Sequence, residues 1–289
     1  MSLSFDQRDG FIWMNGEMSP WADTKVHVLT HGLHYGSCVF EGERAYGGSI
    51  FKLREHTERL FYSARELGFE IPYSVEDIDR ACKETLEING LTDGYLRPVA
   101  WRGSEMMGVS AQNNLINVAV AAWEWPSYFA PEERLKGIRL DMAKYRRPSP
   151  ETAPCHAKAA GLYMICTLSK HEAERKGYAD AMMLDWRGHV AEATGANMFF
   201  IEGNTLHTPT PDCFLDGITR RTVIQLARER GLDIVERTIL PEELKGFSEC
   251  FITGTAAEVT PVSEIGPYHF TPGEISKNLM EDYTALVGA

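Results

Sequence analysis

The chain has 289 residues, of which 44% are hydrophobic and 24% charged, a composition typical of a globular protein with one large domain or two smaller ones. Its formal net charge of −12 argues against nucleic-acid binding, which depends on neutralising phosphate groups. The sequence also contains no apolar run long enough to span a membrane.

Two features of the sequence bear on where the protein acts. The stretch Met1–Gly10 is polar and mixed in charge, unlike a secretory signal peptide. The six cysteines are scattered and form no Cys-x-x-Cys pair, so we expect reduced thiols. We therefore expect a cytoplasmic protein.

Two helices are predicted in the first half of the chain. Apolar residues recur at helical spacing over Leu53–Leu67, and Gly68 supplies a stop. A second helix is predicted to begin after Ser74, which can form a capping box with Asp77, and to run to about Asn89. Both predictions depend on local signals at the helix ends.

Strands and a domain boundary are predicted after these helices. The apolar runs Tyr95–Trp101 and Ile116–Trp123 are typical of strands inside a sheet. The stretch 126–133 contains prolines and charges and favours an interdomain linker. We therefore predict a smaller N-terminal domain over residues 1–125 and a larger C-terminal domain over residues 134–289.

The second half of the chain alternates between expected strands and helices. Strands are expected at Ile138–Ala143, Ala181–Leu184, Met198–Ile201 and Cys250–Thr253, and helices at Ala157–Lys176 and Thr219–Arg230. This alternation indicates a mixed α/β chain in two domains.

Lys158 differs from the other nine of the ten lysines because its neighbours in Cys155–Gly161 are small or apolar. Most of the others lie beside charged residues. Partial desolvation would lower the pKa of the Lys158 amine and make it a usable nucleophile. The alternative is a lysine whose stem lies along an alanine-rich helix start while its amine stays in water.

Two glycine-containing turns could bind anions. Leu215–Arg220 places Gly217 and Thr219 where a helix is expected to begin, and backbone N–H groups there favour phosphate. Gly254–Ala257 is a second turn of small residues that could offer N–H donors to phosphate or carboxylate. Capping threonines and turn glycines are common, so neither turn alone specifies a ligand.

Three histidines, His27, His31 and His34, have the spacing of ligands on one helix face. Their segment, however, contains β-branched residues and glycines, and no acidic or cysteine ligand lies close by. A structural or substrate-adjacent role is the better interpretation. Zinc, phosphate-loop, dinucleotide and nucleophile-elbow motifs do not occur in the sequence, and we expect no metal site.

Seven ordered blocks of the sequence resemble the branched-chain amino-acid aminotransferases, which are fold-type IV pyridoxal-phosphate enzymes. The blocks cover nearly the whole chain: His34–Gly36 with Val39–Gly42 and Arg44–Tyr46; Arg54–His56 with Arg59 and Leu60; Tyr95–Pro98; Lys158 with Tyr163; Glu192 and Ala193 with Asn197; Leu215 with Gly217–Arg220; and Gly254–Glu258. The resemblance implies an α/β (α+β) fold with a smaller N-terminal α/β sandwich domain. The larger C-terminal domain would contain a pseudo-barrel sheet and bind the cofactor.

The resemblance assigns roles in binding pyridoxal 5'-phosphate. Lys158 would hold the cofactor covalently and later move the proton at the substrate Cα. Glu192 would face the pyridine nitrogen, Tyr163 the phenolic oxygen and Leu215 the ring face. Next to Gly217, the phosphate would be bound by Arg59, Ile218, Thr219 and Thr255.

The resemblance also implies a pocket for both an amino acid and a 2-oxo acid. The turn of Thr255, Ala256 and Ala257, helped by Tyr95, would hold the substrate carboxylate. Arg97 would receive the distal carboxylate of glutamate, because an unpaired buried carboxylate is unfavourable. The branched side chain would lie among Phe40, Trp125, Tyr128 and Tyr163, with Tyr35 from a partner subunit, which implies at least a homodimer. Without the resemblance, core packing would be the better explanation of these aromatic residues.

The expected reaction transfers the amino group of L-leucine, L-isoleucine or L-valine to 2-oxoglutarate. Three residues depart from the family's usual pattern, namely His156, Leu162 and Glu43, and Glu43 would place a negative charge near the pocket entrance. The alternatives are a D-amino-acid transaminase, an (R)-selective amine transaminase or a 4-amino-4-deoxychorismate lyase of the same fold, and a binding protein without activity. Tyr95-x-Arg97 and Phe40–Gly42 favour the branched-chain class.

Overall fold

The computed structural model describes residues 4–125 and 135–288. The chain divides into two compact units: unit 1 contains residues 1–126 and 157–161, and unit 2 contains residues 127–156 and 162–289. The predicted linker, residues 126–133, lies outside the described residues. Among those that are described, no helix combines the length and the apolar character that a membrane crossing requires.

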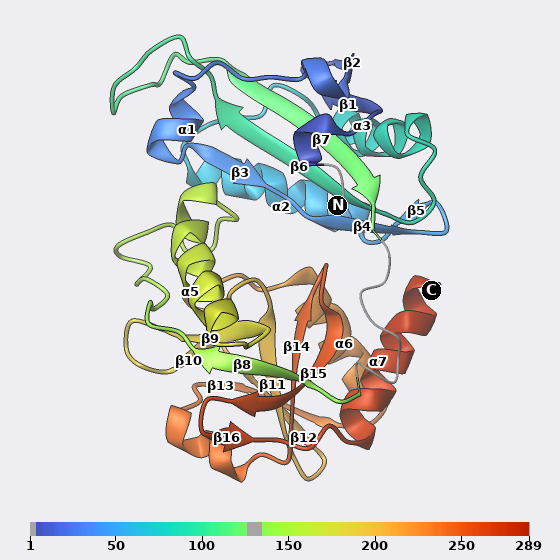
Figure 1. The fold of residues 1–289 in the computed structure, drawn as a ribbon, viewed down its shortest axis with the longest axis vertical. Coiled ribbons are helices and arrows are strands. Elements are labelled where there is room, and N and C mark those ends of the chain that lie inside the picture. The colour runs from blue at the N-terminus through green and yellow to red at the C-terminus, as the bar shows by residue number, and fades with distance from the viewer. Residues whose placement is uncertain (1–3, 126–134, 289) are drawn as a thin grey trace. The chain divides into compact units, whose positions relative to one another are not determined.

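Unit 1 is built on a seven-stranded antiparallel sheet (Figure 1). The strand order is β2-β1-β7-β6-β4-β5, and β3 pairs with β6. The strands are β1 (Phe11–Met14), β2 (Glu17–Pro20), β3 (Cys38–Phe40), β4 (Glu43–Tyr46), β5 (Ser49–Ile50), β6 (Gly94–Arg102) and β7 (Ile116–Glu124). The two strands predicted for this half are confirmed as β6 and β7. A short helix, α1 (His31–Tyr35), lies against β6.

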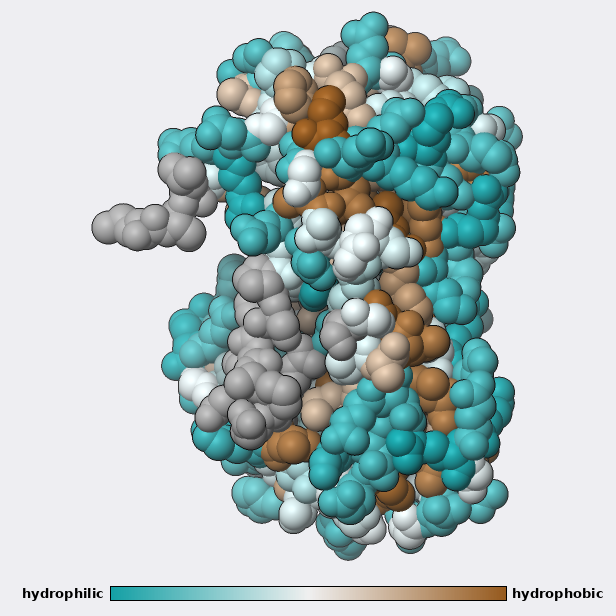
Figure 2. Space-filling model, turned by 90° about the vertical axis from the view of Figure 1, so that its right-hand side faces the viewer, coloured by the Kyte–Doolittle hydropathy of each residue, from teal (hydrophilic) through white to brown (hydrophobic). Residues whose placement is uncertain are grey.

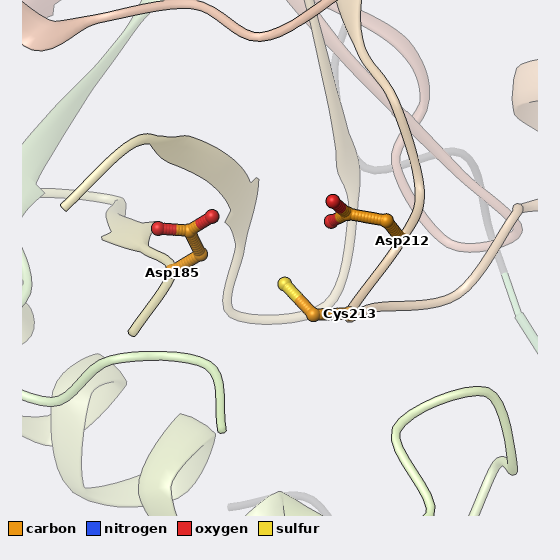
Figure 3. Close-up of side chains that lie close together, drawn as sticks. All are labelled: Asp185, Asp212 and Cys213. Carbon is orange, nitrogen blue, oxygen red and sulfur yellow. The ribbon is translucent and has the colours of Figure 1, made fainter. Parts of the chain in front are cut away.

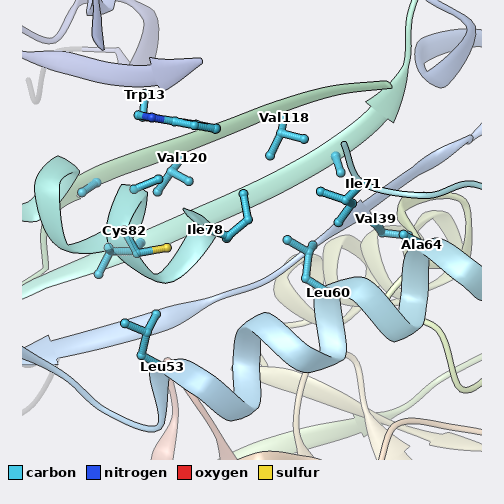
Figure 4. Packing of buried hydrophobic residues seen from close by; sticks show 14 of the residues in the cluster. Trp13, Val39, Leu53, Leu60, Ala64, Ile71, Ile78, Cys82, Val118 and Val120 are labelled. Carbon is cyan, nitrogen blue, oxygen red and sulfur yellow. The ribbon is translucent and has the colours of Figure 1, made fainter. Parts of the chain in front are cut away.

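Two amphipathic helices pack on the sheet of unit 1 and form its core with it (Figure 4). They are α2 (Leu53–Glu66) and α3 (Val75–Ile88), which confirms both helices predicted here. Leu60 of α2 and Ile78 of α3 are fully buried, as is Val120 of β7. Burial of such side chains contributes about 2 kcal/mol each and fixes α2 on the sheet.

Unit 2 contains a nine-stranded sheet, of which six strands close into a ring (Figure 1). The path β10-β9-β8-β15-β14-β11 returns to its start because β10 also pairs with β11. The strands are β8 (Ile138–Met142), β9 (Asp180–Leu184), β10 (Val190–Ala193), β11 (Asn197–Glu202), β12 (Thr205–Pro209), β13 (Asp233–Arg237), β14 (Glu249–Gly254), β15 (Glu258–Ile265) and β16 (Tyr268–His269). The four strands predicted for this half are confirmed as β8, β9, β11 and β14.

Three helices pack on this ring: α5 (Tyr163–Arg175) on β9, α6 (Ile218–Glu229) on β14 and α7 (Glu274–Val287) on β15. The helix predicted at Thr219–Arg230 is confirmed as α6. The helix predicted over Ala157–Lys176 is wrong in its first turns, because residues 157–159 are not helical, Ala160–Leu162 form a 3-10 turn and α5 begins only at Tyr163.

Polar residues predominate on the surface face drawn in Figure 2, where apolar residues gather in smaller areas. This distribution agrees with the charge of −12 and with cores that lie inside each unit. Some large apolar side chains nevertheless remain exposed in unit 1, most of all Val109, which is 86% exposed.

Candidate active site

Lys158 lies on a non-helical segment that is hydrogen-bonded to the sheet of unit 1. Its backbone N–H donates to Ser63 Oγ at 2.9 Å, and its carbonyl accepts from the Phe40 N–H at 3.1 Å. The following residue, Ala159, forms a β-bridge with Val39. The small residues around Lys158 therefore allow this segment to pack closely against β3. Its hydrogen bonds to β3 and Ser63 take the place of those that the predicted helix would have formed.

The side chain of Lys158 is one of two cations beside the ring of Phe40. Lys158 Nζ lies 5.1 Å from the ring centroid, and Arg97 Cζ lies 4.7 Å from it. Arg97 also donates to the Tyr95 hydroxyl at 3.2 Å, and the Tyr95 ring packs on Trp125 at 5.1 Å. Unit 1 thus brings together five of the predicted site residues: an amine, a guanidinium, a phenol and two apolar rings.

The Arg97 side chain keeps a donor available in this cluster. Its Nε is buried and has no hydrogen-bond partner among the described residues. A buried guanidinium donor without a partner is unfavourable, and an incoming carboxylate would satisfy it. The position of Arg97 therefore suits the binding of a carboxylate.

Gly42 permits the position of Tyr95 in the same cluster. A Cβ atom at Gly42 would lie 1.9 Å from the Tyr95 hydroxyl oxygen and 2.8 Å from the adjoining ring carbon. Any larger residue would therefore displace the phenol. Glycine is required here by the close approach of a side chain.

Arg59, on α2, is paired with Glu41, which directly follows β3. Arg59 Nε and one terminal nitrogen donate to the two Glu41 oxygens at 2.7 and 2.8 Å. His56 Nδ1 lies 2.7 Å from the second of these oxygens. The sequence blocks contain Glu41 and His56, but sequence reasoning gave neither a role, because burial of an acid by tertiary packing leaves no local signal.

The sequence predicts that Glu43 places a negative charge near a pocket entrance, and this prediction is wrong. It is fully buried on β4, beside the Cys82 thiol, and its oxygens accept no hydrogen bond from a nitrogen or oxygen donor among the described residues. Burial, together with the nearby Glu41 charge, raises the pKa of Glu43 well above its ordinary value. The buried carboxyl group therefore favours the neutral, protonated form.

The three closely spaced histidines make local contacts in unit 1. His31 Nε2 lies 2.8 Å from the Gly108 carbonyl oxygen, and His34 Nε2 lies 2.8 Å from another backbone carbonyl. His27 Nδ1 accepts from a backbone N–H at 3.1 Å. Tyr35 is 48% exposed and stacks on His31 at 4.6 Å. These contacts fit a structural role for the histidines.

In unit 2, the first turn of α6 has the properties of an anion site. Gly217 is its N-cap, with no side chain donating or accepting there, and Ile218 and Thr219 are both buried. The first N–H groups of a helix lack intrahelical partners and carry the positive end of its dipole. Phosphate is a suitable partner for them.

Asn197, the first residue of β11, holds the loop before α6 in place. Its side-chain amide donates to the Leu215 carbonyl at 2.9 Å. A Cβ atom at Gly217 would lie 2.2 Å from Asn197 Oδ1, so the glycine allows this contact. Asn197 also pairs in register with Glu192 of β10 and Thr253 of β14. Asn197 thus connects β11 to three other candidate segments, namely the loop before α6, β10 and β14, a role that sequence reasoning missed.

Glu192 forms a buried ion pair with Arg147. Arg147 Nε lies 3.2 Å from Glu192 Oε1, and the two side chains are only 4% and 10% exposed. Removing either charge would take a stabilising partner from a buried charge of opposite sign. On β14, the hydroxyl of Thr253 is buried and has no hydrogen-bond partner among the described residues. Thr255, Ala256 and Ala257 follow β14 in a turn.

The described residues contain one group with metal-ligand chemistry: Asp185, Asp212 and Cys213 (Figure 3). Their ligand atoms lie within 4.8 Å of one another. However, the Arg187 guanidinium already lies between the two carboxylates, 2.7 Å from Asp185 and 2.6 Å from Asp212. Burial, with a smaller contribution from Asp212, also raises the pKa of the Cys213 thiol to about 12. An arginine and a neutral thiol explain this cluster without a metal ion.

Comparison with known proteins gives the class of protein that carries this site. The sequence pattern of the amino-transferase class IV family matches residues 38–265, and the chain belongs to that family. A relative from Rickettsia felis, a probable branched-chain-amino-acid aminotransferase, is 40% identical over 99% of this chain and 98% of its own length. Within class IV, the chain is accordingly a member of the branched-chain-amino-acid aminotransferases.

Solved structures of similar proteins agree in fold. A branched-chain amino acid aminotransferase from T.th., with pyridoxamine 5'-phosphate, has a TM-score of 0.94 and 40% identity, over 97% of this chain and 94% of that one. The same enzyme complexed with N-(5'-phosphopyridoxyl)-L-glutamate has a TM-score of 0.92 and 39% identity, over 97% and 95%. The predicted fold, with an α/β N-terminal part and a pseudo-barrel C-terminal part, is confirmed.

Proposed function

We propose that the protein is a pyridoxal-phosphate-dependent aminotransferase. It transfers the amino group of L-leucine, L-isoleucine or L-valine to 2-oxoglutarate and produces the branched 2-oxo acids and L-glutamate. Family membership supports this proposal, as do the names of the relatives. The observation that carries it is the contact of both Lys158 and Arg97 with the ring of Phe40.

The residues present fit pyridoxal 5'-phosphate. Lys158 supplies a primary amine, and the uncapped start of α6 supplies N–H donors for a phosphate. The buried Thr253 hydroxyl, which has no partner among the described residues, is a polar group that a ligand or water would satisfy. We propose that this cofactor is bound by Lys158, Tyr163, Glu192, Leu215 and the remaining predicted residues Arg59, Gly217, Ile218, Thr219 and Thr255.

In the proposed mechanism, Lys158 Nζ removes the proton from the substrate Cα and later delivers a proton to the Cα of the incoming oxo acid. The bound cofactor supplies an electron sink for the charge left at that carbon. Glu192 holds a proton at the pyridine nitrogen, and Arg147 fixes the orientation of its carboxylate. The Thr255–Ala257 turn and Tyr95 orient the substrate carboxylate.

One pocket must accept two kinds of side chain in alternate half-reactions. Phe40 and Trp125 provide apolar surface for a branched side chain, and Arg97 provides a donor for the distal carboxylate of 2-oxoglutarate. An arginine that packs on aromatic rings serves both purposes, because its face is weakly hydrated while its edge binds carboxylate. The predicted contribution of Tyr128 lies outside the described residues.

We propose that the enzyme is a homodimer or higher homo-oligomer and that Tyr35 contributes to the partner's pocket. Support comes from an exposed apolar area around α1, here called the α1 patch. It consists of Val26, Val28, Leu29, Leu33, Tyr35, Met106, Met107 and Val109, all at least 45% exposed. Its two segments are joined by a hydrogen bond from the His31 N–H to the Gly103 carbonyl. Apolar areas of this kind mark protein–protein interfaces.

We also propose that the enzyme acts in the cytoplasm. All six cysteines are free thiols, five of them buried. Free thiols are typical of a reducing compartment. Fractionation of source cells, with the enzyme followed by an antibody, is the test.

Two measurements test the proposed function. Borohydride reduction of the purified protein should abolish its visible absorbance and add the cofactor's mass to the peptide that contains Lys158. The variant Lys158→Arg should lose this labelling, while Lys83→Arg, on the exposed face of α3, should keep it. Failure to bind any pyridoxal 5'-phosphate would reject the proposal.

The substrate class is tested by a panel of amino donors with 2-oxoglutarate. L-Leucine, L-isoleucine and L-valine should exceed D-alanine and (R)-1-phenylethylamine in kcat/KM by at least about a hundredfold, or about 2.7 kcal/mol. A faster rate with D-alanine or with the (R)-amine would assign the enzyme to another branch of class IV.

A further inference from the structure

Glu41 is a buried carboxylate that binds two basic side chains of the same helix. It is fully buried, whereas His56 is 3% and Arg59 15% exposed. Arg59 contacts both carboxylate oxygens in a two-point pairing, and His56 contacts one of them. The pairing fixes the plane of the guanidinium, because both of its hydrogen bonds must be kept.

The charges in this cluster are well defined. Burial alone would raise the pKa of Glu41, but Arg59 and His56 outweigh it and hold that pKa well below its usual range. Burial lowers the pKa of His56, and the nearby Arg59 and Lys158 charges act in the same direction. At pH 7 the carboxylate is therefore ionised and the imidazole neutral, with its Nδ1–H donated to Glu41.

The acid and the two basic residues of this cluster are all held by elements of secondary structure. His56 and Arg59 are three residues apart on α2 and so share a face of the helix. The Glu41 backbone N–H donates to the Pro98 carbonyl of β6 at 2.8 Å. The adjacent residue, Phe40, holds the carbonyl of Lys158. Two neighbouring residues thus anchor the guanidinium of Arg59 and the backbone of Lys158.

A stabilising role alone does not explain this arrangement. Burying an ion pair removes two charges from water, and apolar residues of similar volume often stabilise a core as well or better. The pair is also open on one side only, because Glu41 has no exposed surface and Arg59 retains 15%. The exposed part of the pair therefore belongs to the Arg59 side chain, whose guanidinium carries the charge that an anion would bind.

We infer that Glu41 and His56 are positioning residues that hold the Arg59 guanidinium in the orientation in which it binds the phosphate of the cofactor. The inference rests on the proposed function, in which Arg59 is a phosphate ligand. Glu41 fixes the guanidinium through two hydrogen bonds. His56 fixes Glu41 through a third.

The test compares two ligands that differ only in the phosphate. Apoenzyme prepared from the holoenzyme is titrated with pyridoxal 5'-phosphate and with pyridoxal, and binding is followed by absorbance. Glu41→Gln should raise the Kd for pyridoxal 5'-phosphate at least about tenfold and change the Kd for pyridoxal by less than about twofold. His56→Leu should act in the same direction, and His56→Asn, which keeps a donor near the Nδ1 position, should restore most of the affinity.

Controls separate positioning from loss of structure. Glu43→Gln removes a neighbouring buried carboxylate and should leave the ratio of the two Kd values unchanged. Adding Glu41→Gln to Arg59→Gln should cause no further loss of phosphate-dependent affinity, since Glu41 acts through Arg59; this double variant also avoids a buried unpaired charge.

Two results would overturn the inference: an equal loss for both ligands in Glu41→Gln, or no loss for either. If the wild-type protein binds neither ligand, the proposed function itself fails, which is a separate outcome. If the wild-type protein binds pyridoxal 5'-phosphate and Glu41→Gln binds it with the same Kd, the proposed function stands and the positioning role of Glu41 is wrong.

Discussion

Glu43→Gln should make the protein increasingly more stable than the wild type as the pH rises. In the folded chain Glu43 is fully buried and favours the protonated form, because burial and the nearby Glu41 charge raise its pKa. In the unfolded chain it ionises near its ordinary value of 4.5. Above that value the unfolded state therefore releases a proton that the folded state keeps, and rising pH favours unfolding of the wild type.

The magnitude follows from proton linkage. The wild type should lose about 1.4 kcal/mol relative to Glu43→Gln for each pH unit between the unfolded pKa and the raised folded pKa. Glutamine cannot ionise and keeps the shape of the side chain, so all other titrations cancel in the comparison. For a chain of 289 residues, this loss corresponds to a difference in Tm that widens by about 2 °C per pH unit.

The assay is thermal unfolding of both proteins from pH 5 to pH 8 at constant ionic strength. Glu70→Gln, which removes an exposed carboxylate of unit 1, serves as the matched control and should show no widening difference. A difference between Glu43→Gln and the wild type that stays constant over this range would refute the reasoning. It would mean that Glu43 is ionised in the folded protein.

Three further substitutions test features of the site and surface. Gly217→Ala should place a Cβ atom 2.2 Å from Asn197 Oδ1 and weaken pyridoxal-phosphate binding about tenfold in an absorbance titration, with pyridoxal affected as well because the whole loop moves. Gly42→Ala should displace the Tyr95 hydroxyl and raise KM for L-leucine at least about tenfold in steady-state assays, while cofactor absorbance stays intact. Leu33→Asp, in the α1 patch, should shift the oligomer toward monomer in sedimentation velocity, and an unchanged mass would contradict the proposed interface.

Local signals made two helices of unit 1 predictable to within a residue or two. Ser74 and Asp77 form the predicted capping box, and Gly68, which follows α2, has a positive φ of 68°. Each signal acts through hydrogen bonds or backbone conformations within a few residues, so neighbouring sequence is sufficient.

Features that depend on distant parts of the chain could not be predicted in this way. The small residues around Lys158 fit a helix start equally well, and only hydrogen bonds to β3 and Ser63 hold them in a non-helical conformation. The charge of Glu43 depends on burial by α3 and β6, which no neighbouring residue reports. The roles of the site residues were predicted from resemblance to a family, because relatives keep the same residue types at the same positions of the site. The sequence immediately around each residue does not specify its role.

The path of the chain also limits how this enzyme can be recombined with its relatives. Residues 157–161 belong to unit 1, although the chain enters unit 2 before them and returns to it afterwards. A chimaera that exchanges residues 1–125 alone would join the Lys158 segment of one parent to the β3 strand of another. Chimaeras that take residues 1–125 and 157–161 from the same parent should keep the Lys158 amine in place. Fragments that end before residue 157 would lack Lys158, whatever else they folded.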